Sequence, residues 1–186
     1  FKLSKAVVER RLSLMEQEGV QIITGVHIGK NVPLAEIIDN HDAVCIAIGA
    51  GQPRLMNIEG SEFEGIYQAM DFLSAQNRVT SGIIQAAENK ITAEGKRVLV
   101  IGGGDTGSDC VGSAVRQRAK SVTQIEILPM PPLSRVPENP WPYFAKLLKT
   151  TTSHEEGCER LWGVSTLRFV GHGRITRGPD VENVEW

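Results

Sequence analysis

The first third of the chain shows alternating helix-like and strand-like stretches of apolar residues. Residues 4–18 place apolar side chains among Lys, Glu and Arg, between a capping serine and a glycine, which predicts an amphipathic helix. The β-branched run at 20–24 predicts a strand, and a proline opens a predicted short helix at 33–39. Residues 43–48 are apolar throughout, so we expect a strand that is buried on both faces.

The middle of the chain has weaker periodicity. Residues 53–66 are rich in turn-forming residues, and 67–73 predict one or two helical turns. The polar stretch at 74–95 predicts a connection, with a possible helix at 83–90.

A clear β-turn-α-β pattern follows. Residues 97–101 predict a strand, 106–118 a helix and 121–128 a second strand, with a glycine-rich turn between the first strand and the helix. We therefore expect an α/β protein with a Rossmann-like, three-layer, parallel-sheet dinucleotide-binding fold.

The last part of the chain begins with a proline-rich segment. Residues 129–142 contain six prolines, which predicts an extended surface loop because proline fixes φ and lacks an N–H donor. Residues 141–149 predict a helix. Two strands at 164–170 and 181–186, around a turn at 171–173, predict a hairpin.

The glycine-rich turn carries the candidate chemistry. Gly102, Gly104 and Gly107 satisfy the G-x-G-x-x-G pattern directly after a strand and directly before a helix. In this pattern the first glycine permits the tight turn, the second lets a pyrophosphate approach the backbone, and the third allows close packing between helix and strand. The helix N-terminus supplies N–H groups and a positive dipole end for the phosphates. The alternative is a tight turn that serves packing alone.

Other residues of this segment are further candidates for the dinucleotide site. Gly103, Asp105 and Thr106 lie in or beside the motif, although Asp is a common helix-capping residue and we expect Asp105 to cap the helix. Glu126, 19 residues after Gly107, is placed to accept a ribose 2′-OH and favours NADH, whereas Arg135 could pair with the 2′-phosphate of NADPH. Spacing alone does not fix side-chain direction, so the cofactor preference stays open.

Composition and charge exclude several other classes of function. Hydrophobic residues make up 41% and charged residues 23% of 186 positions, as in ordinary globular proteins. The formal net charge of -2 provides no basic field for a nucleic acid partner, and no apolar run is long enough for a membrane anchor. Three widely spaced cysteines fit neither a disulfide framework nor a cluster site, which favours a cytoplasmic location. The N-terminus lacks an initiator Met, so we expect a fragment of a longer polypeptide.

The remaining reactive side chains favour structural roles. The four histidines show no i, i+4 pairing and no nearby cysteine, so a metal site has little support. Residues 153–156 combine Ser, His and two Glu, a pattern that is equally a helix capping box. Cys110 follows the glycine motif, where a helix dipole can lower a thiol pKa, but we expect it to pack in the core.

Beyond these local patterns, the chain resembles the small (beta) subunit of glutamate synthase and its relatives over nearly its whole length. These proteins are flavoproteins with one FAD-binding and one NAD(P)-binding domain. The most specific matching segments are Gly102–Cys110, Glu126–Pro129 with Pro131 and Pro132, Asn139–Pro142 and Ser153–Gly157. Broader matches are residues 1–3 with 10–11 and 14–16, then 42–50 and 69–73.

This resemblance implies a role in electron transfer. NAD(P)H would dock on the glycine motif and reduce FAD, whose electrons would pass through iron–sulfur centres to the large subunit for glutamate synthesis from glutamine and 2-oxoglutarate. It slightly favours NADPH, whereas Glu126 favours NADH. The NAD(P)H-dependent oxidoreductase activity is expected of the full-length subunit, with the large subunit as partner, and no residue of this chain is expected to act as a catalytic acid or base.

The resemblance also implies a domain division. Residues 1–73 correspond to part of the FAD-side domain, and 74–186 correspond to the NAD(P)-binding domain, whose completeness at the C-terminal end the sequence leaves open. The family's first FAD-binding glycine motif, its cluster cysteines and its C-terminal FAD segment have no counterpart here, so we do not expect this chain to turn over alone. The family usually has Thr where Ile48 stands. Two alternatives remain: a non-catalytic interaction module, and the same fold in another NAD(P)H-dependent flavin reductase.

Overall fold

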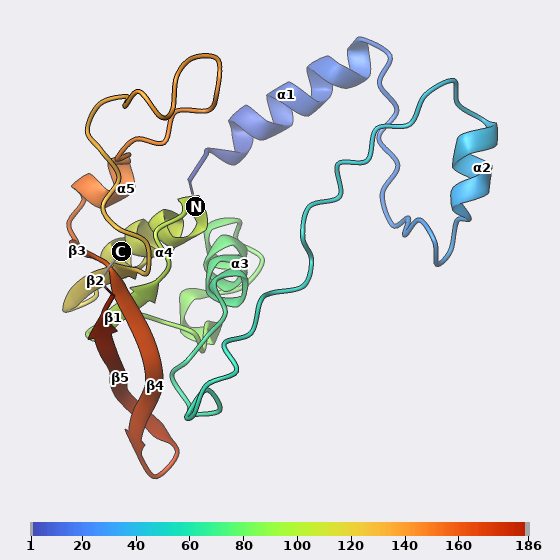
Figure 1. Cartoon of the computed structure of the whole chain (residues 1–186). Coiled ribbons are helices and arrows are strands. Elements are labelled where there is room, and N and C mark those ends of the chain that lie inside the picture. Colours follow the sequence, from blue (N-terminus) through green and yellow to red (C-terminus); the bar gives the residue numbers. More distant parts are fainter. Residues whose placement is uncertain (1, 185–186) are drawn as a thin grey trace. The chain divides into compact units, whose positions relative to one another are not determined.

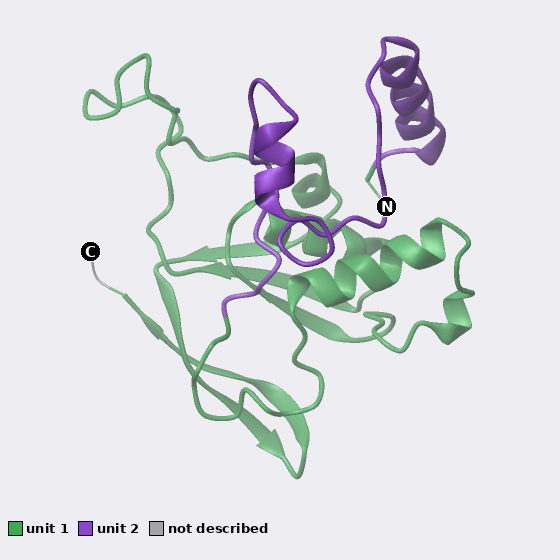
Figure 2. Cartoon of the chain, turned by 90° about the vertical axis from the view of Figure 1, so that its right-hand side faces the viewer, with its two compact units in different colours: residues 1–2, 55–186 green, residues 3–54 purple. Residues whose placement is uncertain are grey.

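The computed structural model describes residues 2–184, which divide into two compact units (Figure 2). Of the described residues, one unit comprises residue 2 and residues 55–184, and the other comprises residues 3–54. The division falls ahead of the expected boundary at residue 73, and the assignment of 1–73 to a FAD-side domain stays a prediction.

A three-stranded parallel sheet lies at the centre of the larger unit. The strands β1 (Arg97–Ile101), β2 (Ser121–Glu126) and β3 (Glu159–Trp162) are ordered β1-β2-β3 (Figure 1). The β1–β2 register runs from the Arg97–Ser121 pair to the Ile101–Ile125 pair. Parallel neighbours need a crossover connection, which the helix between β1 and β2 provides. The expected α/β class with a Rossmann-like parallel sheet is confirmed.

Helix α4 (Asp105–Arg116) is that crossover, and it is the most buried helix of the described chain. Val111 and Ala114 are completely buried and join Val100 of β1 and Val122 of β2 in one apolar cluster. Helix α3 (Ala69–Thr80) adds Leu73 to the same cluster. The region expected to be a connection is therefore helical as far as Thr80, because this helix has an apolar side to bury against α4.

An antiparallel hairpin follows the sheet. Strands β4 (Val164–His172) and β5 (Ile175–Asn183) confirm that a hairpin forms, but its turn lies at 173–174 and not at 171–173, and β5 begins before the expected strand at 181–186. The last two residues of that expected strand lie outside the described residues. The segment before α3 pairs with this hairpin: the Phe169 N–H donates to the Glu59 carbonyl at 2.8 Å, and the Glu64 N–H donates to the Arg174 carbonyl at 2.7 Å.

The smaller unit contains helices α1 (Lys5–Gln17) and α2 (Leu34–Asp39), both close to their expected bounds. Its two expected strands, at 20–24 and 43–48, do not form. No described residue of 3–54 is buried, and Ile48 is 88% exposed. A strand is stabilised by its ladder with a neighbour. Neither run pairs with a strand in the described part of the chain, so neither has the partner it would require.

Two helix predictions are wrong. Residues 141–149 do not form a helix, because the Asn139 side chain accepts from the Lys146 N–H and donates to the Phe144 carbonyl. These bonds satisfy, within a loop, two of the backbone groups that a helix would pair. The possible helix at 83–90 reduces to the 3₁₀ turn η1 (Ala86–Glu88). The short helix α5 (Thr152–Glu155) and strand β3 were not predicted.

Candidate functional site

The glycine motif forms the turn between the C-terminal end of β1 and the N-terminal end of α4. The Gly102 N–H donates to the Ile125 carbonyl at 2.8 Å, which anchors the start of the turn to β2. Gly102 has φ +111°, a backbone conformation that side chains with a Cβ rarely adopt. The turn therefore requires glycine at this position.

The other two motif glycines differ in what surrounds them. A Cβ at Gly107 would lie 2.4 Å from the Gly102 carbonyl oxygen and 2.8 Å from Gln124 Nε2, so this position is closed by packing. A Cβ at Gly104 would meet nothing within 4 Å. Gly104 therefore offers an open approach to the backbone, as a pyrophosphate requires.

The N-terminus of α4 supplies donors beside this opening. Gly104 is the N-cap, and the first helical hydrogen bond runs from the Ser108 N–H to the Gly104 carbonyl at 3.0 Å. The N–H groups of Asp105, Thr106 and Gly107 precede that bond and have no acceptor within the helix. The expectation that Asp105 caps the helix is wrong, because no side chain makes a capping bond here and Asp105 is the first helical residue. Both Asp105 and Thr106 are exposed at the opening.

Glu126 lies at the end of β2 and contacts the glycine turn. Its Oε2 accepts from the Gly103 N–H at 2.6 Å, and its Oε1 accepts from the Leu128 N–H at 3.0 Å. A Cβ at Gly103 would lie 2.8 Å from the same carboxylate oxygen, so the contact depends on this glycine as well. The structure therefore brings Glu126 together with the motif.

Arg135 is engaged elsewhere. Its guanidinium donates to the carbonyl oxygens of Asn139 and Tyr143, at 2.9 and 3.1 Å, and so holds the proline-rich loop in place. These two bonds involve one nitrogen of the guanidinium, and they give Arg135 a structural role. None of its described contacts is with the glycine turn.

Gln124 was missed by the sequence analysis. It lies two residues before Glu126 on β2, it is 2% exposed, and its Nε2 donates to the Gly102 carbonyl at 2.8 Å. The Gly102 carbonyl and the Gly103 N–H belong to one peptide group, so Gln124 and Glu126 hold that peptide from both sides. A polar residue beside the apolar Val122 and Ile125 of a predicted strand was the available signal.

The other reactive side chains are structural. Cys110 is buried, and burial together with the neighbouring Asp109 carboxylate raises the pKa of its thiol to about 11. The expected core role of Cys110 is confirmed. The capping box of α5 begins at Thr151 and not at Ser153. Among residues 2–184, no group of three or more His, Cys, Asp or Glu side chains is placed to hold a metal ion.

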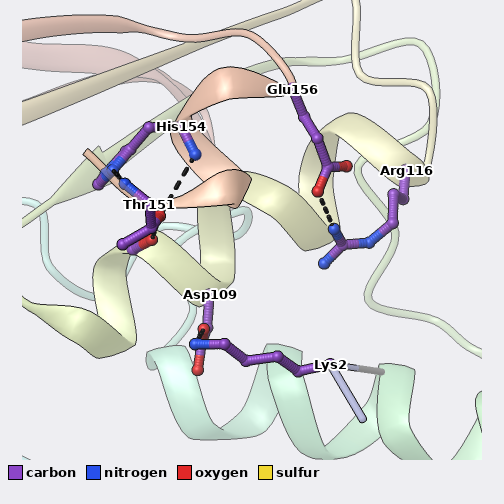
Figure 3. A network of polar contacts seen from close by, with 7 residues as sticks. Lys2, Asp109, Arg116, Thr151, His154 and Glu156 are labelled. Atoms are coloured by element: carbon purple, nitrogen blue, oxygen red, sulfur yellow. Dashed lines mark hydrogen bonds and ion pairs between the residues drawn. The ribbon is translucent and has the colours of Figure 1, made fainter. Parts of the chain in front are cut away.

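Asp109 and Arg116 of α4 each form an ion pair (Figure 3). Lys2 pairs with Asp109 at 2.6 Å, and Arg116 pairs with Glu156 of the segment that follows α5. These pairs are partly exposed, so each adds at most about 1 kcal/mol of stability.

Among the helices of residues 2–184, none has the length and apolar character that a membrane span requires.

A strand, a glycine turn and a helix in this order, with an acidic residue at the end of the next strand, define a dinucleotide-binding motif. Residues 4–151 match the pyridine nucleotide-disulphide oxidoreductase family, and the chain belongs to that family. Within it, the chain is 42% identical over 180 residues to the "Glutamate synthase [NADPH] small chain" of Mycobacterium tuberculosis strain H37Rv, covering 95% of this chain and 37% of that protein.

Two fungal proteins are similar as well. The "Glutamate synthase [NADH]" of Schizosaccharomyces pombe is 44% identical over 158 residues, which cover 84% of this chain and 8% of that protein. The protein of the same name in Saccharomyces cerevisiae is 37% identical over 195 aligned positions, which cover 100% of this chain and 9% of that protein. The expected resemblance to the glutamate synthase small chain is confirmed, and the chain spans little more than a third of the bacterial relative's length.

Proposed function

We propose that the turn at 102–107 and the N-terminus of α4 bind the pyrophosphate of NAD(P)H. The observation that carries this proposal is the open position of Gly104 beside three N–H groups without helical acceptors. Such a site needs no basic side chain, because the N–H groups and the helix dipole supply the positive potential. Asp105 and Thr106 would border the bound phosphates.

The contacts of Glu126 and Arg135 bear on the choice between the two nicotinamide cofactors. A carboxylate at the end of β2 accepts a ribose 2′-OH and repels a 2′-phosphate. Glu126 contacts the turn, whereas Arg135 is bonded within its own loop. These contacts support NADH, while the bacterial relative's name includes NADPH. A direct comparison of the two cofactors is therefore the informative measurement.

In a longer protein, this chain would act as the NAD(P)H-binding part of a glutamate synthase small subunit, as its relatives' names suggest. The nicotinamide would supply a hydride, and FAD held by the rest of such a subunit would accept it. The residues described here bind and orient the dinucleotide. Assembly with a large subunit, and glutamate synthesis from glutamine and 2-oxoglutarate, belong to the same proposal.

An interaction module without cofactor binding is the second candidate. It is favoured by the proline-rich loop, which exposes Leu133, Trp141 and Phe144 although Asn139 and Arg135 hold its backbone in place. A preformed loop with exposed aromatic side chains is typical of surfaces that bind another protein.

The test is a parallel calorimetric titration of the 186-residue protein with NADH and NADPH, and of the variant Gly104→Leu. Gly104 has φ -77° and ψ -179°, an extended conformation that leucine adopts, so the variant should fold while its side chain fills the pyrophosphate approach. Gly51→Leu is the matched control, because Gly51 also has open space around its Cβ position and lies outside the motif.

We expect the unsubstituted protein and Gly51→Leu to bind one cofactor more tightly than the other, and Gly104→Leu to lose that binding while keeping its far-ultraviolet circular dichroism. Equal binding by all three proteins would show that the dinucleotide does not use the glycine turn. No binding of either cofactor by a folded sample would favour the interaction module.

A further inference from the structure

A chain of polar side chains, all buried except the half-buried Thr151, runs from the glycine turn to α5. Gln124 Oε1 lies 2.9 Å from His154 Nε2, and His154 Nδ1 lies 3.2 Å from both the N–H and the hydroxyl of Thr151. Ser108 of α4 closes the chain with a 2.5 Å contact to the Thr151 hydroxyl. His154 is 8% exposed, so water does not replace these bonds. Figure 3 shows His154 and Thr151 above α4.

The donors and acceptors fix the tautomer of His154. The Thr151 backbone N–H can only donate, so Nδ1 must accept and the proton of the neutral ring lies on Nε2. Nε2–H then donates to Gln124 Oε1. The other end of the Gln124 amide, its NH₂ group, is directed at the Gly102 carbonyl.

This orientation of the Gln124 amide decides the contact with the turn. A glutamine amide has nearly the same shape when its oxygen and nitrogen exchange places. In the exchanged orientation, its oxygen would face the Gly102 carbonyl oxygen, and two acceptors would oppose each other. His154 prevents that exchange, because its Nε2–H needs an acceptor at the position that Oε1 holds.

The Gly102–Gly103 peptide group therefore has three supports. Gln124 holds its carbonyl, Glu126 holds its N–H, and His154 fixes which atom Gln124 presents. The plane of this peptide sets the direction in which the chain continues to Gly104 and to the first N–H groups of α4. A rotated peptide would move the donors that the proposed pyrophosphate site uses.

We propose that His154 and Gln124 are positioning residues for dinucleotide binding: His154, protonated on Nε2, directs the Gln124 amide and thereby sets the Gly102–Gly103 peptide for the pyrophosphate. This inference rests on the function proposed above. Neither side chain touches the reacting atoms, and both act through the glycine turn.

Two substitutions at position 154 separate positioning from mere packing. In His154→Gln the side-chain nitrogen reaches the place of Nε2 and can still donate to Gln124. In His154→Asn the shorter amide reaches only the place of Nδ1, so Gln124 loses its partner. Gln124→Glu removes the donor to the Gly102 carbonyl at constant shape. Glu155→Gln on the same short helix is the control, because Glu155 is exposed and outside the network.

The readouts are calorimetric titration with NADH and with NADPH, the melting temperature, and the amide signals of Gly102, Gly103 and Gly104 in ¹⁵N-labelled protein. We expect His154→Asn and Gln124→Glu to bind about tenfold more weakly, which corresponds to about 1.4 kcal/mol, because each variant loses one hydrogen bond that holds the turn. We expect the three glycine signals to shift in these variants. His154→Gln should stay within about threefold of the unsubstituted protein and keep the glycine signals, even if its melting temperature falls as much as that of His154→Asn.

Equal loss of affinity in His154→Gln and His154→Asn would overturn the inference, as would unchanged affinity in a folded His154→Asn variant. If the unsubstituted protein binds neither dinucleotide, the proposed function fails and the positioning of a dinucleotide site fails with it. The glycine signals then show separately whether His154 sets the peptide, so the two failures are told apart.

Discussion

Gly107→Ala is the sharpest test of how α4 packs against the glycine turn. Alanine is favoured over glycine in helix interiors by about 1 kcal/mol, so helix propensity alone predicts a more stable protein. The structure predicts the opposite. The new Cβ would lie 2.4 Å from the Gly102 carbonyl oxygen, which is about 1 Å closer than ordinary van der Waals contact at 3.4 Å.

The protein can relieve this contact only by moving backbone. The Gly102 carbonyl is held by Gln124 and cannot swing away like the end of a flexible side chain. If α4 shifts instead, Val111 and Ala114, which are completely buried, lose contact with the sheet. A gap of about 0.5–1 Å forfeits a quarter to a half of each dispersion contact, and overpacking of this kind costs about 1–3 kcal/mol. Because the obstacle is backbone, we expect the upper end of this range, about 3 kcal/mol; the gain of about 1 kcal/mol from helix propensity then leaves a net loss of about 2 kcal/mol.

Urea denaturation followed by circular dichroism at 222 nm measures this difference, with Gly51→Ala as the control at an open glycine. For a domain of this size, about 2 kcal/mol corresponds to a fall in the melting temperature of about 4–8 °C. The control should differ from the unsubstituted protein by less than about 0.5 kcal/mol. A Gly107→Ala variant that is as stable as the unsubstituted protein, or more stable, would refute the close packing of this turn.

Two further predictions follow from the perturbed pKa values. Because burial raises the pKa of the Cys110 thiol to about 11, only about one molecule in a thousand holds the reactive thiolate at pH 8. Alkylation with iodoacetamide, followed by peptide mass spectrometry, should therefore show the exposed Cys45 modified well before Cys110. Equal rates of modification at the two cysteines would contradict the burial of Cys110. Burial, followed by Arg160, lowers the pKa of His154 below its ordinary value of 6.5, so the unfolded chain takes up a proton at a pH where the folded protein does not. The free energy of unfolding should therefore fall as the pH drops from 6.5 toward the folded pKa, and more steeply than in His154→Gln. Urea denaturation at several pH values measures this dependence in both proteins. If the free energy of unfolding changes equally with pH in both, His154 is not neutral and buried in the folded protein.

The β1–α4–β2 unit could be predicted from the sequence because its signals are local. An apolar strand, a G-x-G-x-x-G turn and a helix with one apolar face follow one another within 30 residues, and each element agrees with the next. Glu126 was found for the same reason, since its distance along the chain from Gly107 is set by the length of one helix and one strand. The sequence offered Arg135 as an equal candidate, but a loop does not fix the direction of a side chain, and the structure gives Arg135 carbonyl partners in that loop.

The elements that were missed depend on partners far along the chain. Strand β3 has only four residues, and it forms because β2 offers a free edge, with Thr123 paired to Glu159. The run at 43–48 has the stronger strand pattern, yet it finds no neighbour among the described residues and stays exposed. Whether a strand forms here therefore depends on an available sheet edge and not on the apolar run alone.

The register between β1 and β2 determines the conformation of the glycine turn. Side chains two residues apart on a strand point to the same face, so Gln124 and Glu126 reach the turn together while Ile125 between them is buried on the other side. One side chain donates to the Gly102 carbonyl and the other accepts from the Gly103 N–H, so the pair matches the two ends of one peptide group. A slip of one residue between β1 and β2 would replace both supports by apolar side chains or remove them from the turn. The glycines allow the turn to exist, but the parallel register, Val100 beside Gln124 and Ile101 beside Ile125, gives it one conformation.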